Sequence, residues 1–346
     1  MNSPKVRFAV VMGLLLLGLG ARAWLALEYP SVYWGDGIFQ VLEPAHEAVF
    51  GYGITPMEFK EGLRSWIFPG IVAGLMWLSE PLGAGSWGYL TVVTIALSAL
   101  SLVPAVVAWR WAERREGLAW APLLAILPPL VWTELVYFGP KAVYEVFTAH
   151  LFVLGLFWLR FADDGLHRPA LAGLLFGVCF LNRPHLGPSI AAVGGVVLVS
   201  CEDRYRRFTW MVVGLAIGVA IGGTVDALTW DVPFHSMIAN SYHNLIQDKA
   251  SRWGTSPFWQ YPVWIWRVSP VGALLLGASL ISGLVRKPFL AWPAAMVLLA
   301  HSGIPHKEYR FIYPAIVMAT VIVGVEFSSV VDGLHERFRR SAVAVG

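Results

Sequence analysis

The chain has 346 residues, of which 57% are hydrophobic and only 14% are charged. Soluble domains carry about 25% charged residues, so a single water-soluble core cannot account for this composition. A soluble enzyme, a disordered protein and a disulfide-stabilised secreted domain are excluded, and the sequence predicts an all-α polytopic membrane protein. The net charge is only +3 and the basic residues are scattered, which argues against nucleic acid as a partner.

The chain opens with a candidate membrane span. Lys5 and Arg7 precede an apolar run over residues 8–21, and this run can continue past Arg22 as a first transmembrane helix. Arg22 would then snorkel to the interface or face the protein. The Ala-Arg-Ala sequence at 21–23 also resembles a signal-peptidase site, so cleavage there is the less favoured alternative.

Further uncharged stretches follow, and with the first they predict about ten spans in one transmembrane domain covering residues 1–346. The stretches are 81–109, 118–133, 146–159, 170–182, 186–200, 208–225, 268–285, 288–305 and 311–325. Several are shorter than the roughly 20 residues that a perpendicular span needs, so we expect broken helices surrounded by protein or by a water-filled cavity. The 170–182 and 186–200 runs would form a hairpin that turns at residues 182–185.

Basic residues predict the orientation, because cytoplasmic loops carry an excess of Lys and Arg. The clusters that would face the cytoplasm are Lys5/Arg7, Arg110/Arg114/Arg115, Arg160/Arg168, Arg204/Arg206/Arg207, Arg286/Lys287 and Arg337/Arg339/Arg340. Both termini then lie in the cytoplasm, provided that residues 66–79 do not span. We therefore predict an interfacial or re-entrant helix near 66–79. A single long helix over 170–200, in place of the hairpin, would change the number of spans by one and place the two termini on opposite faces of the membrane.

This orientation leaves two large loops on the non-cytoplasmic face, residues 28–65 and 231–261, with short turns at 137–145, 182–185 and 306–310. Many of the remaining cations fall on these segments: Lys60, Arg64, Lys141, Arg183, Lys249, Arg252, Lys307 and Arg310. Charges near membrane depth are costly, so their clustering in short turns favours an anionic ligand. Ordinary loop charge is the alternative.

Two segments carry residues suited to chemistry. Asp36 lies between glycines directly after the first span, and its carboxylate can act as a general base or cap a turn. Glu43 and Glu47 have i, i+4 spacing and would share a helix face, which could simply be solvated. The turn at 306–310 packs cations that suit phosphate, with an interfacial aromatic anchor as the alternative.

The second large loop mixes aromatic, amide and His side chains, which could form a sugar-binding platform or pack at the interface. No HExxH or similar metal-ligand spacing is present, and there is no nucleotide-binding glycine loop. Cys179 and Cys201 lie in or beside apolar runs and are predicted to be buried thiols.

The stretch at 306–314, HKEYRFIYP, resembles the HKE-x-RF-x-(Y/F)-P signature of glycosyltransferase family 22. Members include the dolichol-phosphate-mannose-dependent α-mannosyltransferases of N-glycan and GPI-anchor assembly. Three other stretches agree in order: residues 36–46 with the family's first-loop D-E-x-(F/Y)-x-x-x-E-P-x-H pattern, residues 63–65 with its LRS, and residues 226–261 with its later luminal loop. The likeness covers most of the chain.

The resemblance implies a GT-C fold and a transferase that takes sugar, most often mannose, from a polyprenyl phosphate at the non-cytoplasmic face. It implies no cofactor or metal, and an inverting displacement with Asp36 as catalytic base. Its donor phosphate would be held by His306, Lys307 and Arg310, with Arg64 and Arg183 as secondary candidates. Substrate-binding candidates are Glu43, His46, Lys141, Asp226, Trp230, Arg252, Trp259 and Glu308. The expected partners are the donor, a lipid-linked or glycan acceptor and the lipid bilayer.

The sequence departs from the family pattern in two respects. Gly37 stands where the family has a second acidic residue, so no carboxylate pair is expected there. The chain is also shorter than eukaryotic members, so we expect acceptor-recognition parts to differ or be missing. The lack of an Asn-X-Ser/Thr sequon favours a bacterial inner membrane over the endoplasmic reticulum.

Two other functions remain open from the sequence. A transporter or flippase of lipid-linked glycans would place its charges near the bilayer midplane, often in paired halves. Here the cations gather on one predicted face and no internal repeat is detectable, which favours the enzyme. An inactive, receptor-like relative is the third possibility.

Overall fold

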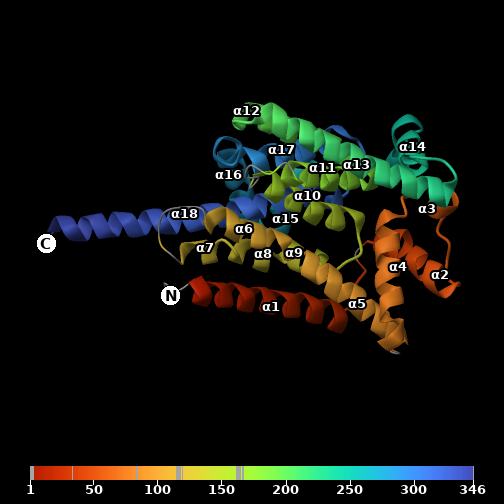
Figure 1. The fold of residues 1–346 in the computed structure, drawn as a ribbon, viewed down its shortest axis with the longest axis horizontal. Helices are drawn as coiled ribbons and strands as arrows, with labels where there is room; N and C mark the ends of the chain where they lie inside the picture. Colours follow the sequence, from red (N-terminus) through yellow and green to blue (C-terminus); the bar gives the residue numbers. More distant parts are fainter. Residues whose placement is uncertain are drawn as a thin grey trace.

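The computed structural model describes residues 4–32, 34–82, 85–113, 118, 120–160, 165 and 167–345. Over these residues the chain is built from helices without any β-strand, which confirms the predicted all-α class. The long helices α1, α13 and α18 lie along the long axis of the molecule, and the shorter helices pack between them (Figure 1). The predicted cytoplasmic residues Arg114 and Arg115 lie outside the described residues.

The first half of the chain forms short and medium helices after one long one. The helices are α1 (Pro4–Glu28), η1 (Ile38–Leu42), α2 (Glu43–Phe50), α3 (Met57–Lys60), α4 (Ile67–Ser79), η2 (Glu80–Leu82), α5 (Gly85–Leu100), α6 (Val103–Glu113), α7 (Ala121–Leu124), α8 (Leu127–Val131), α9 (Thr133–Phe138) and α10 (Tyr144–Arg160).

The second half contains longer helices joined by short turns and by the loop around α14. The helices are α11 (His167–Asn182), η3 (Pro184–Leu186), α12 (Gly187–Ser200), α13 (Arg204–Trp230), α14 (His235–Ser241), η4 (Tyr242–Ile246), η5 (Lys249–Trp253), α15 (Gln260–Val268), α16 (Pro270–Arg286), α17 (Pro288–Gly303), η6 (Tyr309–Ile312) and α18 (Tyr313–Val345).

Proline sets where several of these helices begin. Helices α7, α8, α12, α16 and α17 each carry Pro at the first or second position, where its missing N–H has no helical partner to lose. The apolar stretch at 118–133 is thereby divided between α7, α8 and the start of α9. At α16 the Ser269 side chain also caps the helix by accepting from the Gly272 amide at 3.0 Å.

Arg22 ties the first helix to one of these breaks. Its guanidinium is 1% exposed and donates to the carbonyls of Leu130 at 2.9 Å and Pro129 at 3.1 Å. Helix α8 ends at Trp132, which has an extended ψ of 122°, so the carbonyls of its last turn lack partners within the helix. Of the two sequence alternatives, Arg22 therefore faces the protein, where it satisfies a helix end.

Helices α11 and α13 pack closely enough that glycine is required on both. A Cβ at Gly173 would lie 1.9 Å from the Met211 carbonyl oxygen, and one at Gly214 would lie 1.8 Å from that of Ala170. Further along, Gly222 faces Leu181, so residue numbers rise together and the two helices run parallel. Helix α12, which follows α11 and precedes α13 in the chain, must then run in the opposite direction, which confirms the predicted reversal at 182–185.

Four helices in the described part of the chain are long and apolar enough to cross a membrane: Lys5–Glu28, Trp87–Glu113, Arg204–Trp230 and Tyr309–Phe338. Shorter apolar helices include Ile67–Ser79 and Pro270–Arg286. The count of about ten spans and the cytoplasmic termini therefore stay predictions. Helix α4 crosses the direction of α1 and α13 (Figure 1), in line with a segment near 66–79 that lies outside the spanning set.

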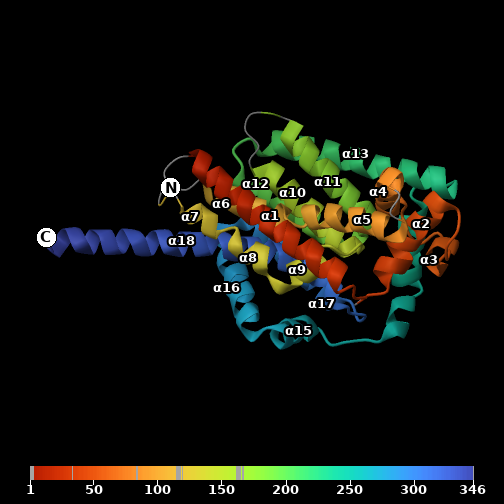
Figure 2. The same cartoon turned by 90° about the horizontal axis from the view of Figure 1, so that it is seen from below.

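The two ends of the helical bundle carry different segments of the chain. The segments predicted as outer loops meet at the end that carries α2, α3 and α14, while the C-terminal part of α18 projects from the other end (Figures 1 and 2). Hydrogen bonds join the first large loop to the second loop and to the end of α13. The Asn240 amide donates to the Leu63 carbonyl at 3.2 Å, and the Trp230 indole donates to the Arg64 carbonyl at 3.2 Å.

We predict that Gly173→Ala lowers the free energy of unfolding by about 1–3 kcal/mol, because its methyl group has to push the α13 backbone away. Gly195→Ala on α12 is the matched control, since a Cβ there meets nothing within 4 Å. Thermal unfolding in detergent measures both. An equal loss of stability in the two variants would contradict the close packing of α11 on α13.

Candidate functional site

Arg310 lies at the centre of a buried group of ion pairs. Its side chain is 7% exposed, and one terminal nitrogen pairs with the Asp36 carboxylate. The other terminal nitrogen is 2.8 Å from Oε2 of Glu308, and Nε is 3.8 Å from Oε1 of Glu145. Three carboxylates from three separate segments therefore share one guanidinium.

A second arginine extends this group. Arg183 donates to the Glu145 carboxylate at 3.1 Å and to the Gln40 side-chain oxygen at 3.4 Å. The Gln40 amide nitrogen in turn donates to Asp36 and, at 2.9 Å, to Glu58. Arg64 joins the group through Glu58, at 3.5 Å. We call the whole group the arginine–carboxylate network; its members are Asp36, Gln40, Glu58, Arg64, Glu145, Arg183, Glu308 and Arg310.

The network is assembled from helix ends and short turns. Asp36 follows α1, Glu145 lies in the first turn of α10, and Arg310 is in η6 between α17 and α18. Arg183 occupies the turn between α11 and α12 with φ −144° and ψ 85°, an extended conformation imposed by the following Pro184. Proline thus both reverses the chain and directs Arg183 into the site.

The charges of the network hold Asp36 ionised. Burial by itself would raise the pKa of Asp36, but the nearby guanidinium of Arg310, followed by those of Arg183 and Arg64, outweighs burial and holds the pKa below its ordinary value. Asp36 is therefore a carboxylate at neutral pH. It is also a weaker base for as long as Arg310 remains its partner.

Gly37 serves packing rather than an unusual backbone conformation. Its φ of −61° and ψ of −38° are helical, so the backbone conformation does not require glycine here. A Cβ would lie 3.4 Å from the Ala142 carbonyl oxygen and from Val143. Two other carboxylates, Glu145 and Glu308, contact the same arginine as Asp36.

The contacts of His306 and Lys307 differ from those of Arg310. The Lys307 ammonium donates to the carbonyls of Ser256 at 3.1 Å and Ile304 at 2.5 Å, and burial lowers its pKa. The His306 ring contacts the Gly254 carbonyl at 3.0 Å and Glu308 at 3.1 Å. Of the three residues predicted to hold the donor phosphate, Arg310 lies in the network, His306 contacts it through Glu308, and both His306 and Lys307 hold the loop before α15.

The remaining first-loop candidates also hold loops in place. Glu43 accepts from the Ile54 amide at 3.1 Å, and the His46 ring contacts the Tyr52 carbonyl at 3.0 Å. Glu47 accepts from Thr55 at 2.9 Å, so Glu43 and Glu47 face the same segment as their spacing predicted. These side chains lie outside the arginine–carboxylate network.

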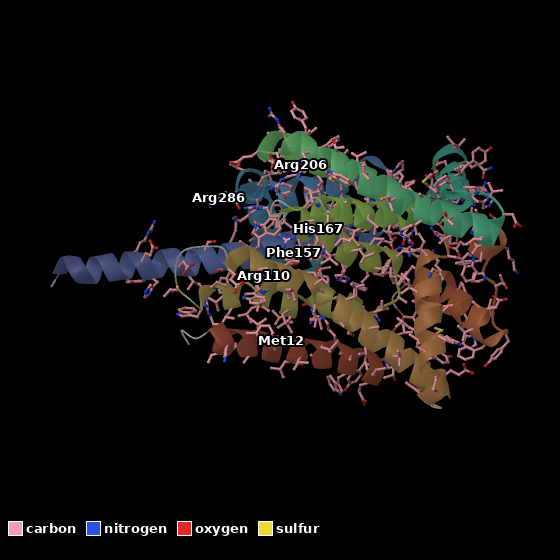
Figure 3. The ribbon with its side chains drawn as sticks, in the orientation of Figure 1. Met12, Arg110, Phe157, His167, Arg206 and Arg286 are labelled. Carbon is pink, nitrogen blue, oxygen red and sulfur yellow. The ribbon has the colours of Figure 1, made fainter. Side chains whose placement is uncertain are left out.

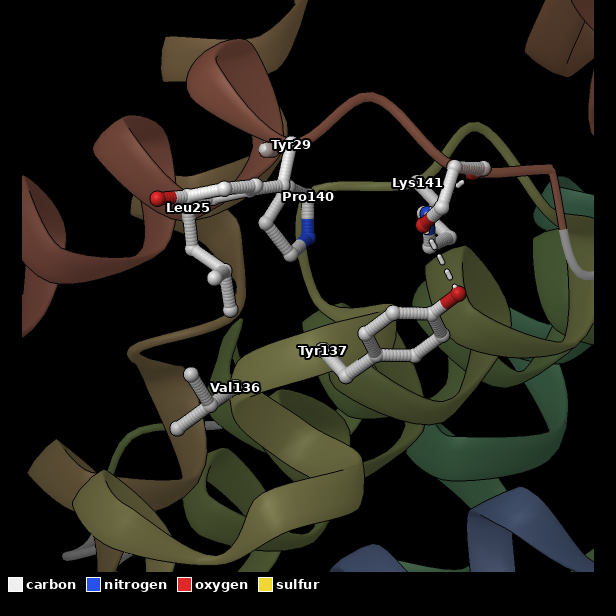
Figure 4. Close-up of a pocket in the computed structure, with 8 residues that line it drawn as sticks. Leu25, Tyr29, Val136, Tyr137, Pro140 and Lys141 are labelled. Atoms are coloured by element: carbon white, nitrogen blue, oxygen red, sulfur yellow. Dashed lines mark hydrogen bonds between the residues drawn. The ribbon is translucent and has the colours of Figure 1, made fainter.

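The candidates in the later segments are dispersed. Asp226 is fully buried and accepts from the amide and hydroxyl of Ser236. Lys141 donates to the Ser31 carbonyl at 2.6 Å and lines a separate cavity beside Tyr137 (Figure 4). Arg252 and Trp259 are exposed. None of these four contributes to the network among the contacts described.

A cavity of about 650 Å³ adjoins the network at Glu308. Aromatic side chains form much of its wall, including Trp34, Tyr137 and Trp264, and Trp34 stacks on Phe138 with ring centroids 4.2 Å apart. Such a wall offers apolar faces with a few polar edges, which suits a sugar ring or an isoprenoid chain. In the described part of the chain no three His, Cys, Asp or Glu residues are arranged to hold a metal ion.

Sequence reasoning missed three members of the network. Glu145 is fully buried at the start of an apolar helix, and a carboxylate at that position could have been singled out because buried charges require partners. Gln40 and Glu58 carry no such signal, since amides and acids are ordinary in a polar loop. Cys179 is buried as predicted, and Cys201 is half-buried.

Comparison with known proteins gives the family. The family model described as the Alg9-like mannosyltransferase family matches residues 14–345. The chain belongs to this family. Its sequence is 29% identical to GPI mannosyltransferase 3 of Yarrowia lipolytica over 84% of this chain and 57% of that one. It is 23% identical to GPI alpha-1,2-mannosyltransferase 3 of Xenopus laevis over 95% of this chain and 62% of that one.

The chain thus spans about three fifths of the length of these curated relatives, 57% and 62%. Among solved structures, ArnT from Cupriavidus metallidurans bound to undecaprenyl phosphate aligns with a TM-score of 0.62, covering 93% of this chain and 59% of that one at 15% identity. This likeness confirms the expected GT-C fold. The sequence relatives named here are eukaryotic, so they give no support to the expected bacterial source.

We predict that Glu145→Gln lowers the free energy of unfolding by about 3 kcal/mol, because it leaves Arg183 without its charged partner in a buried position. Glu61→Gln is the control, since Glu61 is 45% exposed and lies 3.7 Å from His243. Denaturation of both variants in detergent measures the difference. A loss below about 1 kcal/mol for Glu145→Gln, typical of surface pairs, would mean that the network is solvated.

We also predict a pH-dependent contribution of Asp36 to stability. Its folded-state pKa lies below the ordinary value of about 3.9, so its stabilising effect is complete above about pH 5 and is lost as pH falls through the folded-state pKa. The melting-temperature gap between wild type and Asp36→Asn should therefore narrow between about pH 6 and pH 3. A gap that widens on acidification would contradict the sign of the shift.

Proposed function

We propose that the chain is an integral-membrane mannosyltransferase that moves mannose from a polyprenyl-phosphate donor to a lipid-linked glycan acceptor. Family membership supports the sugar and the reaction class. The relatives are named for GPI mannosyl transfer, and one shorter match is an Arabidopsis thaliana enzyme named as a dolichol-phosphate-mannose-dependent alpha-1,6-mannosyltransferase. The acceptor class is proposed by analogy with these names.

The observation that carries the proposal is the pairing of Arg310 with Asp36. The cation of the 306–310 turn and the carboxylate of the first loop are 274 positions apart in the chain, and they were singled out separately as phosphate ligand and base. A transferase needs both groups within reach of one sugar, because the base removes the acceptor proton on one side of the anomeric carbon and the phosphate departs on the other.

In the proposed reaction the acceptor hydroxyl oxygen attacks the anomeric carbon, and Asp36 takes the hydroxyl proton. The bond from that carbon to the phosphate oxygen breaks, and the polyprenyl phosphate leaves with the electron pair. Arg310, with Arg183 behind it, stabilises the charge that develops on the phosphate. A single displacement of this kind inverts the anomeric configuration and requires neither an enzyme nucleophile nor a metal ion.

Donor binding would also activate the base. When the donor phosphate occupies Arg310, the cation no longer acts on Asp36 alone, so the pKa of Asp36 rises toward the working range of a general base. Glu145 and Glu308 keep Arg310 in place during this exchange. We assign the aromatic cavity beside Glu308 to the sugar or the adjoining isoprene units of the donor.

The network end of the molecule is assigned to the non-cytoplasmic face. The support is the positive-inside distribution, since Arg110, Arg206 and Arg286, from three of the predicted cytoplasmic clusters, lie toward the end from which α18 projects (Figure 3). The bacterial inner membrane remains a sequence-based proposal without support from the relatives.

We predict that Asp36→Asn lowers mannosyl transfer by about 10²–10⁴-fold, the usual contribution of a general base. The assay uses purified protein, radiolabelled polyprenyl-phosphate-mannose and a glycolipid acceptor. Asp231→Asn is the control, because Asp231 is an exposed residue at the end of α13 with a left-handed φ of 59° that Asn tolerates.

Arg310→Lys should lower transfer by about 10²-fold or more, since Lys cannot reproduce the bidentate contact to phosphate. Full activity of Asp36→Asn would remove the proposed base. If the wild type transfers no sugar but scrambles lipid-linked glycans in vesicles, the enzyme proposal fails in favour of a flippase.

A further inference from the structure

The end of the molecule opposite the arginine–carboxylate network holds a second charged cavity. Its volume is about 490 Å³, and four cations contribute to its wall: Arg160, Arg207, Arg286 and Lys287. One carboxylate, Glu202, lies among them. Such an excess of positive charge in a concave site favours an anionic ligand.

The cations come from three separate places in the chain. Arg160 ends α10, Arg207 lies in the first turn of α13, and Arg286 and Lys287 lie between α16 and α17. Figure 3 shows Arg206 and Arg286 at the same end of the molecule, on the side from which α18 projects. The packing of these helix ends, rather than one run of basic sequence, therefore gathers the charge.

This cavity is distinct from the candidate active site. Helix α10 carries Glu145 at one end and Arg160 at the other, which separates the two sites by about 22 Å at 1.5 Å per residue. None of the residues that line this cavity belongs to the arginine–carboxylate network. A ligand bound here would not contact Asp36.

The surroundings of the cavity point to a lipid rather than a soluble anion. Trp111 and Phe289 provide apolar parts of its wall. Next to lining residues in sequence, Val199 is 82% exposed and Val285 is 87% exposed. Exposed valines beside a basic cavity on a membrane protein suit acyl chains beside a phosphate headgroup.

We propose that this cavity binds the headgroup of an anionic glycerophospholipid. Arg207 and Arg286 contact the phosphodiester, and the acyl chains lie along the exposed apolar surfaces of α12 and α16. The first turn of α17 opens at the same wall and adds the partial positive charge of a helix N-terminus. The bound lipid would link the ends of α10, α13 and α16, and so stabilise the helical bundle.

The test measures binding of phosphatidylglycerol to the purified full chain by native mass spectrometry, with the melting temperature as a second readout. Phosphatidylcholine and inorganic phosphate at matched concentrations are the comparison ligands. We expect phosphatidylglycerol alone to bind and to raise the melting temperature, because a ligand of the folded state stabilises it by mass action.

The double variant R207Q/R286Q should weaken phosphatidylglycerol binding by about ten- to thirty-fold. R206Q/R337Q is the matched control, since it removes the same charge from exposed positions that do not line the cavity. R207K/R286K keeps the charge and should retain most of the binding, which separates loss of the ligand from loss of the fold.

Three results would overturn the proposal. Equal weakening in R207Q/R286Q and R206Q/R337Q would mean diffuse attraction by the basic end. Equal protection by inorganic phosphate would identify a soluble anion as the ligand. Equal binding of phosphatidylcholine would mean that the cations play no part.

Discussion

The structure of the candidate site depends on one constraint: a buried guanidinium must be paired. Arg310 is almost entirely removed from solvent, and an unpaired charge in that position would be strongly destabilising. Asp36, Glu145 and Glu308 satisfy it from three different segments. The first loop, the start of α10 and the turn before α18 are therefore held together by the same group that is proposed to bind phosphate.

Buried polar groups are also paired elsewhere in the helical bundle, and close helix packing positions the site. Prolines break the apolar segments, which frees backbone carbonyls, and Arg22 satisfies those at the end of α8. Glycines on α11 and α13 allow the backbones to touch, which fixes where Arg183 emerges from the turn that follows α11. The site is thus positioned by packing at some distance from it, and the short helices are part of how its charges are brought together.

The pairing also has a functional consequence. Every cation in the network already has a carboxylate partner, so an incoming phosphate competes with Asp36 for Arg310 rather than filling an empty site. This exchange would couple donor binding to the strength of the base. His306 and Lys307 act indirectly, because their contacts hold the loop before α15 against the 306–310 turn. The basic cavity at the other end of α10 is separate from this exchange.

The sequence by itself determined the membrane class and the family, and it singled out Asp36 and Arg310 as separate candidates, because scarce charge in an apolar chain marks functional positions and the 306–314 motif is specific. It also gave the reversal at 182–185, since Pro184 cannot continue a helix. It could not distinguish His306 and Lys307 from Arg310, because the direction of each side chain depends on which loop packs against the turn.

Only the tertiary structure decided which carboxylates face the arginines. Glu58 and Gln40 are ordinary polar residues in sequence, and Glu145 stands out only as a carboxylate at the start of an apolar helix. All three become members of the site through contacts with residues between 4 and 165 positions away. The same holds for Arg22, whose role depends on carbonyls 107 and 108 residues distant. Local patterns record which side chains are polar or apolar, whereas the pairing of buried charges is set by how the helix ends meet.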